Sequence, residues 1–172
     1  MSLPTNNQSA LDFTIKADIS NSCRELNAII ESGIFSQTNI QNPLLKASFA
    51  YTLVLLRDLI CKANKYGSTK VNFTDDIRIN NTIKNIDDLI KYVRDALCHL
   101  NSPNHYIENN IKFSFNVAFG KANVAKIGDL ELNSLYEDDI CFFFGSQKIY
   151  LNRHILRAFN EAKKSLESYI IF

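Results

Sequence analysis

The stretch ASFAYTLVLL, residues 47–56, is the most apolar run in the chain, and it decides how the other elements must be arranged. It belongs to a segment, residues 43–65, that is apolar nearly all round, which is typical of a central, buried helix. Pro43 suits the first turn of such a helix. Because the run ends at Arg57 and Asp58, it is far shorter than the roughly 20 residues that a membrane span needs. We therefore expect a buried core helix and no membrane contact.

Apolar residues at intervals of three and four mark three more helices. The predicted segments are residues 6–32, 81–100 and 152–170. Gly33 follows the first of them, at the place where a left-handed C-cap would lie. Together with the central helix, these segments predict four main helices.

The period of the apolar pattern changes between the third and fourth helices. Residues 113–119 alternate large apolar side chains with smaller or polar ones, which is a strand signal. Residues 138–152, DDICFFFGSQKIYLN, form a second apolar stretch broken by a Gly-Ser turn, as in a hairpin. We therefore expect a mainly α fold, a bundle of four helices with a small β-hairpin insertion at about 111–150, in a single domain spanning 1–172.

Composition narrows the class of protein. The chain has 172 residues and a net charge of +1, so it lacks the overall positive charge that is typical of many nucleic-acid-binding proteins. The start of the chain lacks the basic and apolar regions of a secretory signal. The cysteines lie far apart and form no C-x-x-C pair, which argues against a zinc ribbon or a thioredoxin-like site and favours small buried side chains in a reducing, cytoplasmic protein. We expect no metal and no cofactor. The cysteines are Cys23, Cys61, Cys98 and Cys141.

The predicted third helix separates its apolar and polar residues cleanly. On a helical wheel its apolar residues fall within an arc of about 140°, and the charged residues occupy the opposite side. Arg94 and His99 both lie on that polar side and form the pattern R-x4-H. The simplest interpretation is a solvated helix face that carries ordinary charge.

The segment RDALCH, residues 94–99, resembles the R-x4-6-H motif of the HEPN superfamily, whose members are small helical bundles. A polar residue commonly follows the arginine of that motif, and Asp95 takes this place here. The resemblance covers the four predicted helices, whereas the β insertion lies outside the common plan and the subfamily is not identified. It implies a HEPN-like bundle that acts as a homodimer and cleaves RNA without a metal ion, as a toxin or defence effector with a possible antitoxin partner.

The side chains of the motif suit this chemistry. RNA carries an internal nucleophile, the 2′-OH, beside every phosphodiester. Histidine can move protons near neutral pH, and arginine offers a permanent charge to phosphate oxygens. On an ideal helix Arg94 and His99 are about 140° apart, so a second copy of the chain would bring the two together more simply. Asp95 could orient His99, or it could be an ordinary surface partner in an i,i+4 pair.

Other charged residues are candidates of lower rank. Asp58 could support Arg94 from the central helix, while Arg57 could simply extend to the surface. A basic stripe on the last helix could follow an RNA backbone, or it could be a solvated face. The residues of this basic stripe are Arg153, His154, Arg157 and Lys164.

Two alternatives to a ribonuclease stay open. The chain could be a HEPN-like module that binds a protein or a nucleotide without chemistry, or a structural helical domain in which R-x4-H arises by chance. In some HEPN toxins a tyrosine two residues after the motif histidine is modified, but Asn101 stands there in this chain and Tyr106 is too far along. His105 is expected to be a loop residue.

Overall fold

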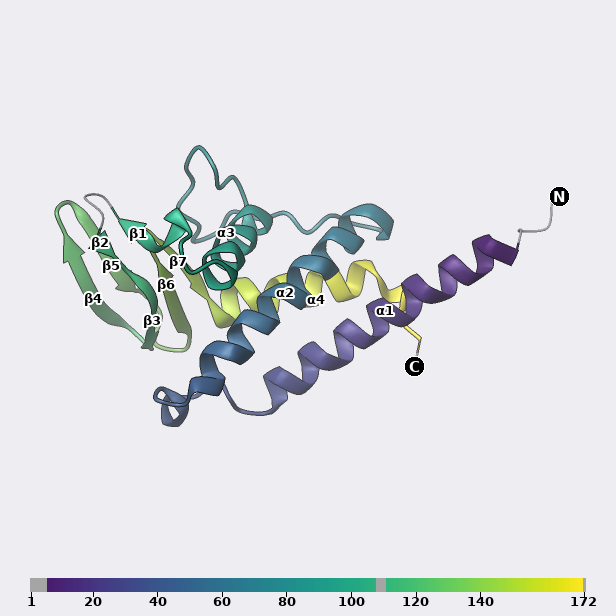
Figure 1. Ribbon diagram of the computed structural model, residues 1–172, viewed down its shortest axis with the longest axis horizontal. Helices are drawn as coiled ribbons and strands as arrows, with labels where there is room; N and C mark the ends of the chain where they lie inside the picture. Colours follow the sequence, from purple (N-terminus) through teal and green to yellow (C-terminus); the bar gives the residue numbers. More distant parts are fainter. Residues whose placement is uncertain (1–5, 108–110, 172) are drawn as a thin grey trace.

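The computed structural model describes residues 6–107 and 111–171, and within them four α-helices stand beside a group of short β-strands (Figure 1). The strands gather at one end of the molecule, and the first helix extends beyond the other helices at the opposite end. The helices are α1 (Asn6–Glu31), α2 (Pro43–Tyr66), α3 (Ile86–Cys98) and α4 (Arg157–Ser165).

Seven strands are present among the described residues, arranged in three small antiparallel sheets. The sheets have the strand orders β1-β2, β3-β6-β7 and β4-β5. The strands are β1 (Tyr106–Ile107), β2 (Ile111–Lys112), β3 (Ser114–Phe119), β4 (Ala122–Ile127), β5 (Leu130–Ser134), β6 (Ile140–Phe144) and β7 (Gln147–Tyr150).

The predicted fold class, a mainly α bundle with one hairpin, is wrong, because the chain mixes helices with three sheets. The expected hairpin does form, as Phe144 pairs with Gln147 across the Gly145–Ser146 turn. A second hairpin, β4–β5, lies between residues 113–119 and the expected hairpin, where no strand was predicted, and Ile127 pairs there with Leu130. Its two-residue turn begins at Gly128, whose φ of 60° suits the turns that join tight hairpins.

The first two predicted helices are confirmed, and Gly33 has the expected positive φ of 71°. The third is shorter than 81–100. Its N-cap is Asn85, whose side chain accepts a hydrogen bond from the Asp88 amide, and it ends at Cys98. His99 has extended backbone angles (φ −124°, ψ 102°), so it lies outside the helix.

The last predicted helix is confirmed in position but not in regularity. A π-helical turn, Leu151–Leu156, leads into α4, and a 3₁₀ turn, Glu167–Tyr169, follows it. A π-turn at the start of a helix changes the direction in which its side chains point. The spacing used to assign the basic stripe to one face therefore does not hold over its first residues.

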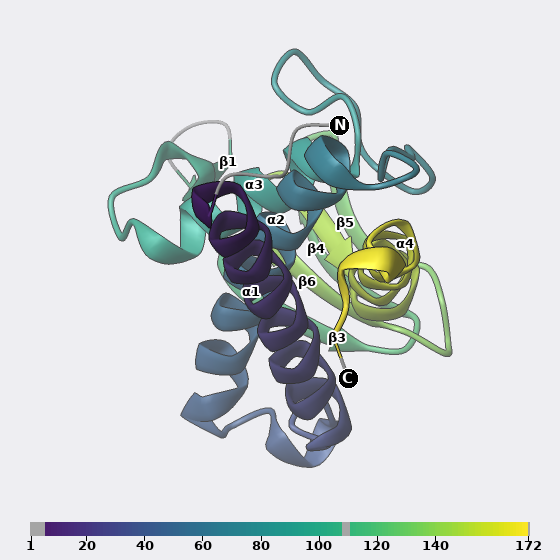
Figure 2. The same ribbon diagram turned by 90° about the vertical axis from the view of Figure 1, so that its right-hand side faces the viewer.

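The core joins the helices to the three-stranded sheet. Both α1 and α4 pack against α2, on different sides of it (Figure 2). Phe49 of α2 stacks on Phe142 of β6 with ring centroids 3.9 Å apart, and both side chains are fully buried. Phe35, Phe115 and Phe144 surround this pair. The central position of α2 is thus confirmed, although Leu44, Tyr51 and Val54 along one side of it are exposed.

The cysteines divide into two pairs with different surroundings. Cys23 and Cys141 are buried, as expected, whereas Cys61 and Cys98 are exposed, contrary to expectation. Burial raises the pKa of the Cys141 thiol to about 12, so this group stays protonated and unreactive near neutral pH.

No helix in the described part of the chain has the length and the apolar content to cross a membrane.

Replacing Phe49 by alanine is expected to lower the free energy of unfolding by about 3–5 kcal/mol, because the change opens a cavity where the helices meet the sheet. Phe13→Ala is the matched control, since Phe13 is 65% exposed and should change stability by less than about 0.5 kcal/mol. Urea denaturation of both variants measures the difference. Equal effects would show that the two parts of the fold do not depend on this stack.

Candidate functional site

The arginine of the R-x4-H motif is held by the residue that follows it. Arg94 Nη2 and Nε donate to the same carboxylate oxygen, Oδ1 of Asp95, over 2.6 and 3.1 Å. The two side chains are about one third exposed. No other described residue pairs with this guanidinium, so Nη1 remains available to an anion at the surface.

The histidine of the motif lies at the end of the same helix. His99 is the C-cap of α3, its amide donates to the carbonyl of Asp95, and its side chain is exposed. Because its backbone is extended, the angle of 140° expected for a continuous helix does not describe its direction. Asp95 therefore contacts Arg94 through its side chain and His99 through its backbone.

A second histidine, His105, contacts the backbone of His99. Its ring nitrogen Nε2 is 3.1 Å from the carbonyl oxygen of His99, and since a carbonyl only accepts, Nε2 carries the proton. His105 is 6% exposed, and its Nδ1 has no hydrogen-bond partner among the residues described. The expectation of a simple loop residue missed this contact, which fixes the chain as it leaves α3.

The segment after the motif is anchored to α3 by a reciprocal pair. The Tyr92 hydroxyl donates to the carbonyl of Asn104 (3.1 Å), and the Nδ2 group of the Asn104 side chain donates to the backbone carbonyl of Tyr92 (3.0 Å). The 3₁₀ turn Pro103–His105 therefore packs against α3. The end of α3 and the residues that follow it form one ordered unit.

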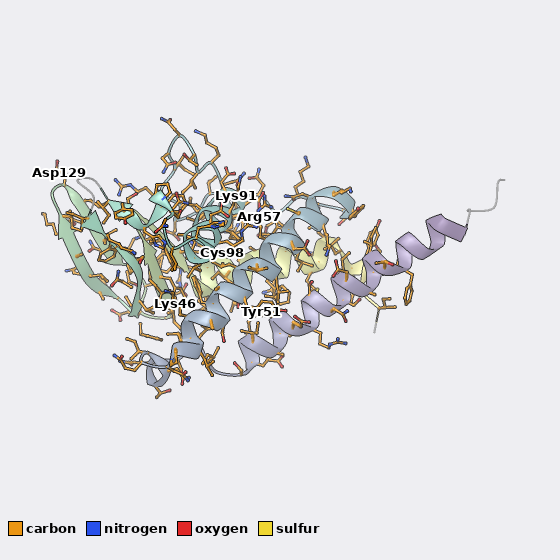
Figure 3. The ribbon with its side chains drawn as sticks, in the orientation of Figure 1. Lys46, Tyr51, Arg57, Lys91, Cys98 and Asp129 are labelled. Atoms are coloured by element: carbon orange, nitrogen blue, oxygen red, sulfur yellow. The ribbon has the colours of Figure 1, made fainter. Side chains whose placement is uncertain are left out.

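Further charged and thiol groups lie on the same side of α3. Arg57 of α2 reaches the first turn of α3 through Asp87, and Lys91 and Cys98 follow further along α3 (Figure 3). Arg57 pairs with Asp87 at 2.8 Å and also contacts the Cys61 thiol, so it reaches a partner at the edge of the core. Burial raises the pKa of Asp87, which the nearby guanidinium partly offsets.

Asp58 does not join this group. Its carboxylate pairs with Lys62, which also bonds Asp18 of α1. Among the described residues the side chain of Arg94 bonds Asp95 rather than Asp58. The structure thus places Asp58 in the contact between α1 and α2, away from the role of a support for Arg94.

The basic stripe is largely neutralised by acidic residues from distant parts of the sequence. Arg153 pairs with Asp138 and with Asp139, whose side chain is fully buried. Asp139 also accepts from the backbone amides of Asn152 and Arg153, so it caps the start of the last helical segment. Sequence reasoning missed this carboxylate, because Asp139 directly precedes a strand and reaches the helical segment only through the tertiary fold.

His154 is a structural histidine. It is fully buried, the Tyr150 amide donates to its Nδ1, and its Nε2 lies 3.0 Å from the carbonyl of Asp75. Nε2 therefore carries the single proton of a neutral ring. Burial lowers the pKa of His154, because a charged imidazole would be poorly solvated there.

The remaining two residues of the basic stripe differ from each other. Arg157 bonds Asp75 (2.8 Å) and Glu161 (2.9 Å), and its guanidinium lies 3.9 Å from the ring centre of Phe73. Arg157 in turn holds the pKa of Asp75 below its ordinary value. Lys164 is exposed and is the member of the stripe whose charge faces solvent. The four residues therefore do not form one free basic surface.

Comparison with protein-family models, with curated proteins and with solved structures found no match to this chain. Within the described residues, no group of three histidine, cysteine or acidic side chains has the spacing to hold a metal ion. A function for this site therefore rests on the chemistry of its own side chains.

The buried state of His154 predicts a pH dependence of stability. The unfolded imidazole takes up a proton near pH 6.5 and the folded one only at lower pH, so the unfolded state binds more protons in this window. The free energy of unfolding should therefore fall as the pH is lowered from 7.5 to 5.5, with a slope of at most about 1.4 kcal/mol per pH unit. Urea denaturation at several pH values measures this slope.

His154→Gln should flatten the slope, since glutamine does not titrate. His99→Asn removes an exposed histidine and should leave the slope unchanged. The assignment is contradicted if His154→Gln keeps the slope of the unaltered chain.

Proposed function

We propose that the chain is an endoribonuclease in which Arg94 and His99 of two copies meet to form one reaction centre. The observation that carries the proposal is that a guanidinium and an imidazole, both accessible, lie at the end of one rigid helix. The support comes from these side chains and from the likeness of RDALCH to the R-x4-6-H motif. The fold adds no support to the proposal, because it is not the mainly α bundle that the likeness implied.

The proposed reaction uses groups that the side chains can supply. One imidazole accepts the proton of a ribose 2′-OH, and the 2′ oxygen attacks the neighbouring phosphorus. The bond from phosphorus to the 5′ oxygen breaks, a second imidazole gives that oxygen a proton, and a 2′,3′-cyclic phosphate remains. The Arg94 guanidinium stabilises the negative charge that gathers on the phosphate oxygens. DNA lacks the 2′-OH and should be spared.

A second copy is needed because one chain supplies a single accessible imidazole at this place. His105 is buried and bonded to the backbone of His99, so it cannot exchange protons with a surface ligand as it stands. A two-fold contact through the exposed face of α3 would place two histidines and two arginines together. The exposed apolar residues of α2, Leu44, Tyr51 and Val54, offer area for such a contact.

A binding module without chemistry is the second candidate. The bond between Arg94 and Asp95 favours it, since a guanidinium already paired with a carboxylate is less available to a phosphate. The same apolar residues of α2 would then receive a partner protein. In a cell, a cytoplasmic ribonuclease used as a toxin or defence effector should arrest growth when expressed, and a cognate antitoxin should relieve the arrest; a binding module should not act in this way.

Arg94→Ala and His99→Ala should each lower RNA cleavage by about 10²- to 10⁴-fold, because each removes a group that acts in the transition state. Cleavage is measured on single-stranded RNA in the presence of a metal chelator, with DNA of the same sequence alongside. Arg24→Ala is the matched control, since Arg24 is an exposed arginine of α1 that bonds only Asn21 among the residues the structure describes. Cleavage that persists in both motif variants, with folding verified by circular dichroism, would overturn the proposal.

Mixing with an inactive chain tests the shared centre. A dimer of one unaltered chain with one Arg94→Ala/His99→Ala chain retains a single histidine and a single arginine, so it lacks the second imidazole that the reaction uses. After subunit exchange with an excess of the double variant, cleavage per unaltered chain should therefore fall, whereas a centre built within one copy would keep it. If cleavage per unaltered chain stays constant while mixed dimers form, the centre does not combine residues of two copies.

A further inference from the structure

A polar cleft of about 340 Å³ lies between segments that are far apart in the sequence. It is bounded by the loop before α3, by β1, by the β4–β5 hairpin and by the β6–β7 turn. None of the R-x4-H residues lines it. The lining residues are Arg78, Asn80, Tyr106, Ile107, Ile127, Leu130, Ser146 and Gln147.

The side chain of Gln147 suggests that the cleft is a built site. Gln147 is 1% exposed, and its Oε1 has no hydrogen-bond partner among the residues described. Buried carboxamides are almost always bonded, because an unpaired polar group in the interior has lost its hydrogen bonds to water without replacement. A carboxamide can offer a donor and an acceptor side by side, which matches the edge of a nucleobase.

The other walls add the remaining parts of a nucleotide site. Tyr106 is 39% exposed and presents an aromatic ring on which a flat base can stack, with Ile107 on the same strand. Arg78 is exposed, and no described residue forms an ion pair with it, unlike the arginines of the basic stripe. Its guanidinium is therefore available to a phosphate.

The cleft is held in shape by close backbone contacts. Gly145 has a φ of 53°, and a side chain there would come within 2.8 Å of the carbonyl oxygen of Asn104 and 3.0 Å of that of Tyr106. The amide of Gly145 also donates to the carbonyl of Phe113. The β6–β7 turn that carries Gln147 is thus packed directly against the segment that carries Tyr106.

We infer that this cleft binds one unpaired nucleotide of an RNA strand, with the base on Tyr106, its edge on Gln147 and a phosphate on Arg78. The choice of RNA rests on the proposed function. The volume suits a single nucleotide, and the mixed lining suits a base better than an apolar ligand. Tyr106 follows His99 by seven residues through the ordered turn at Pro103–His105, so a strand bound here would run towards the reaction centre.

The test measures binding apart from cleavage. All proteins carry His99→Ala so that the RNA stays intact, and the probes are fluorescein-labelled hexanucleotides of uridine and of adenosine, followed by anisotropy. Tyr106→Ala should weaken binding by roughly 5- to 150-fold. Arg78→Ala should weaken it about tenfold and lower the slope of log Kd against log salt by about 0.7. Gln147→Leu should reduce the difference in Kd between the two hexanucleotides.

Two exposed residues outside the cleft serve as matched controls, Arg24→Ala and Phe13→Ala, and these should keep the full affinity. No binding of either hexanucleotide, or binding that the three cleft variants leave unchanged, would overturn the inference. UMP or AMP competing as strongly as a hexanucleotide would overturn the assignment to RNA and leave a free nucleotide as the ligand.

The result is separable from that for the ribonuclease. If the unaltered chain cleaves RNA and the cleft variants bind it normally, the inference falls and the proposed function stands. If the cleft variants lose binding and no chain cleaves RNA, the proposed function falls and the nucleotide site stands.

Discussion

The stack of Phe49 on Phe142 couples the helical half of the molecule to its three-stranded sheet. Neither half could bury its apolar face alone, because α2 is apolar on most sides and β6 is buried along nearly its whole length. The ring of phenylalanines around the stack includes Phe115, which has a φ of 53° at a bulge in β3. The bulge turns the Phe115 side chain towards the helices, where it packs against Phe49 in the core that the helices and the sheet share.

A buried carboxylate has a comparable role at the start of the last helical segment. Asp139 receives three backbone amides and the guanidinium of Arg153, and these donors compensate its charge although its side chain is excluded from water. The loop that carries Asp75 closes over the same segment through His154 and Arg157. Charges that resemble a surface for RNA in the sequence are thus part of the packing between distant segments.

The elements that could be predicted from the sequence are those fixed by residues close together in the chain. Helices α1 and α2 and the β6–β7 hairpin were predictable, because their patterns are local. The β4–β5 hairpin was not recognised, since charged residues such as Lys126 and Glu131, which pair on its exposed face, interrupt its apolar alternation. The partners of Arg153 and Arg157 could not have been predicted, because Asp139 and Asp75 are brought to them only by the tertiary fold.

The candidate site shows the same division. The polar face of α3 was predictable from spacing, and Arg94 and Asp95 lie on it as a bonded pair. The end of the helix was not, because the extended backbone of His99 depends on how the next turn packs against Tyr92. Where a motif spans the end of a helix, a helical wheel therefore gives the direction of its first residue and not of its last.

The position of this helix end also relates the two proposed sites to each other. Tyr106 follows His99 by only seven residues, and within this short segment Asn104 bonds the backbone of Tyr92 in α3 while His105 bonds the backbone of His99. Movement of one site relative to the other would require these partly buried hydrogen bonds to break. A nucleotide held on Tyr106 would therefore lie at a set distance from the imidazole of His99, which is the condition for a binding site to select the bond that a nearby reaction centre cleaves.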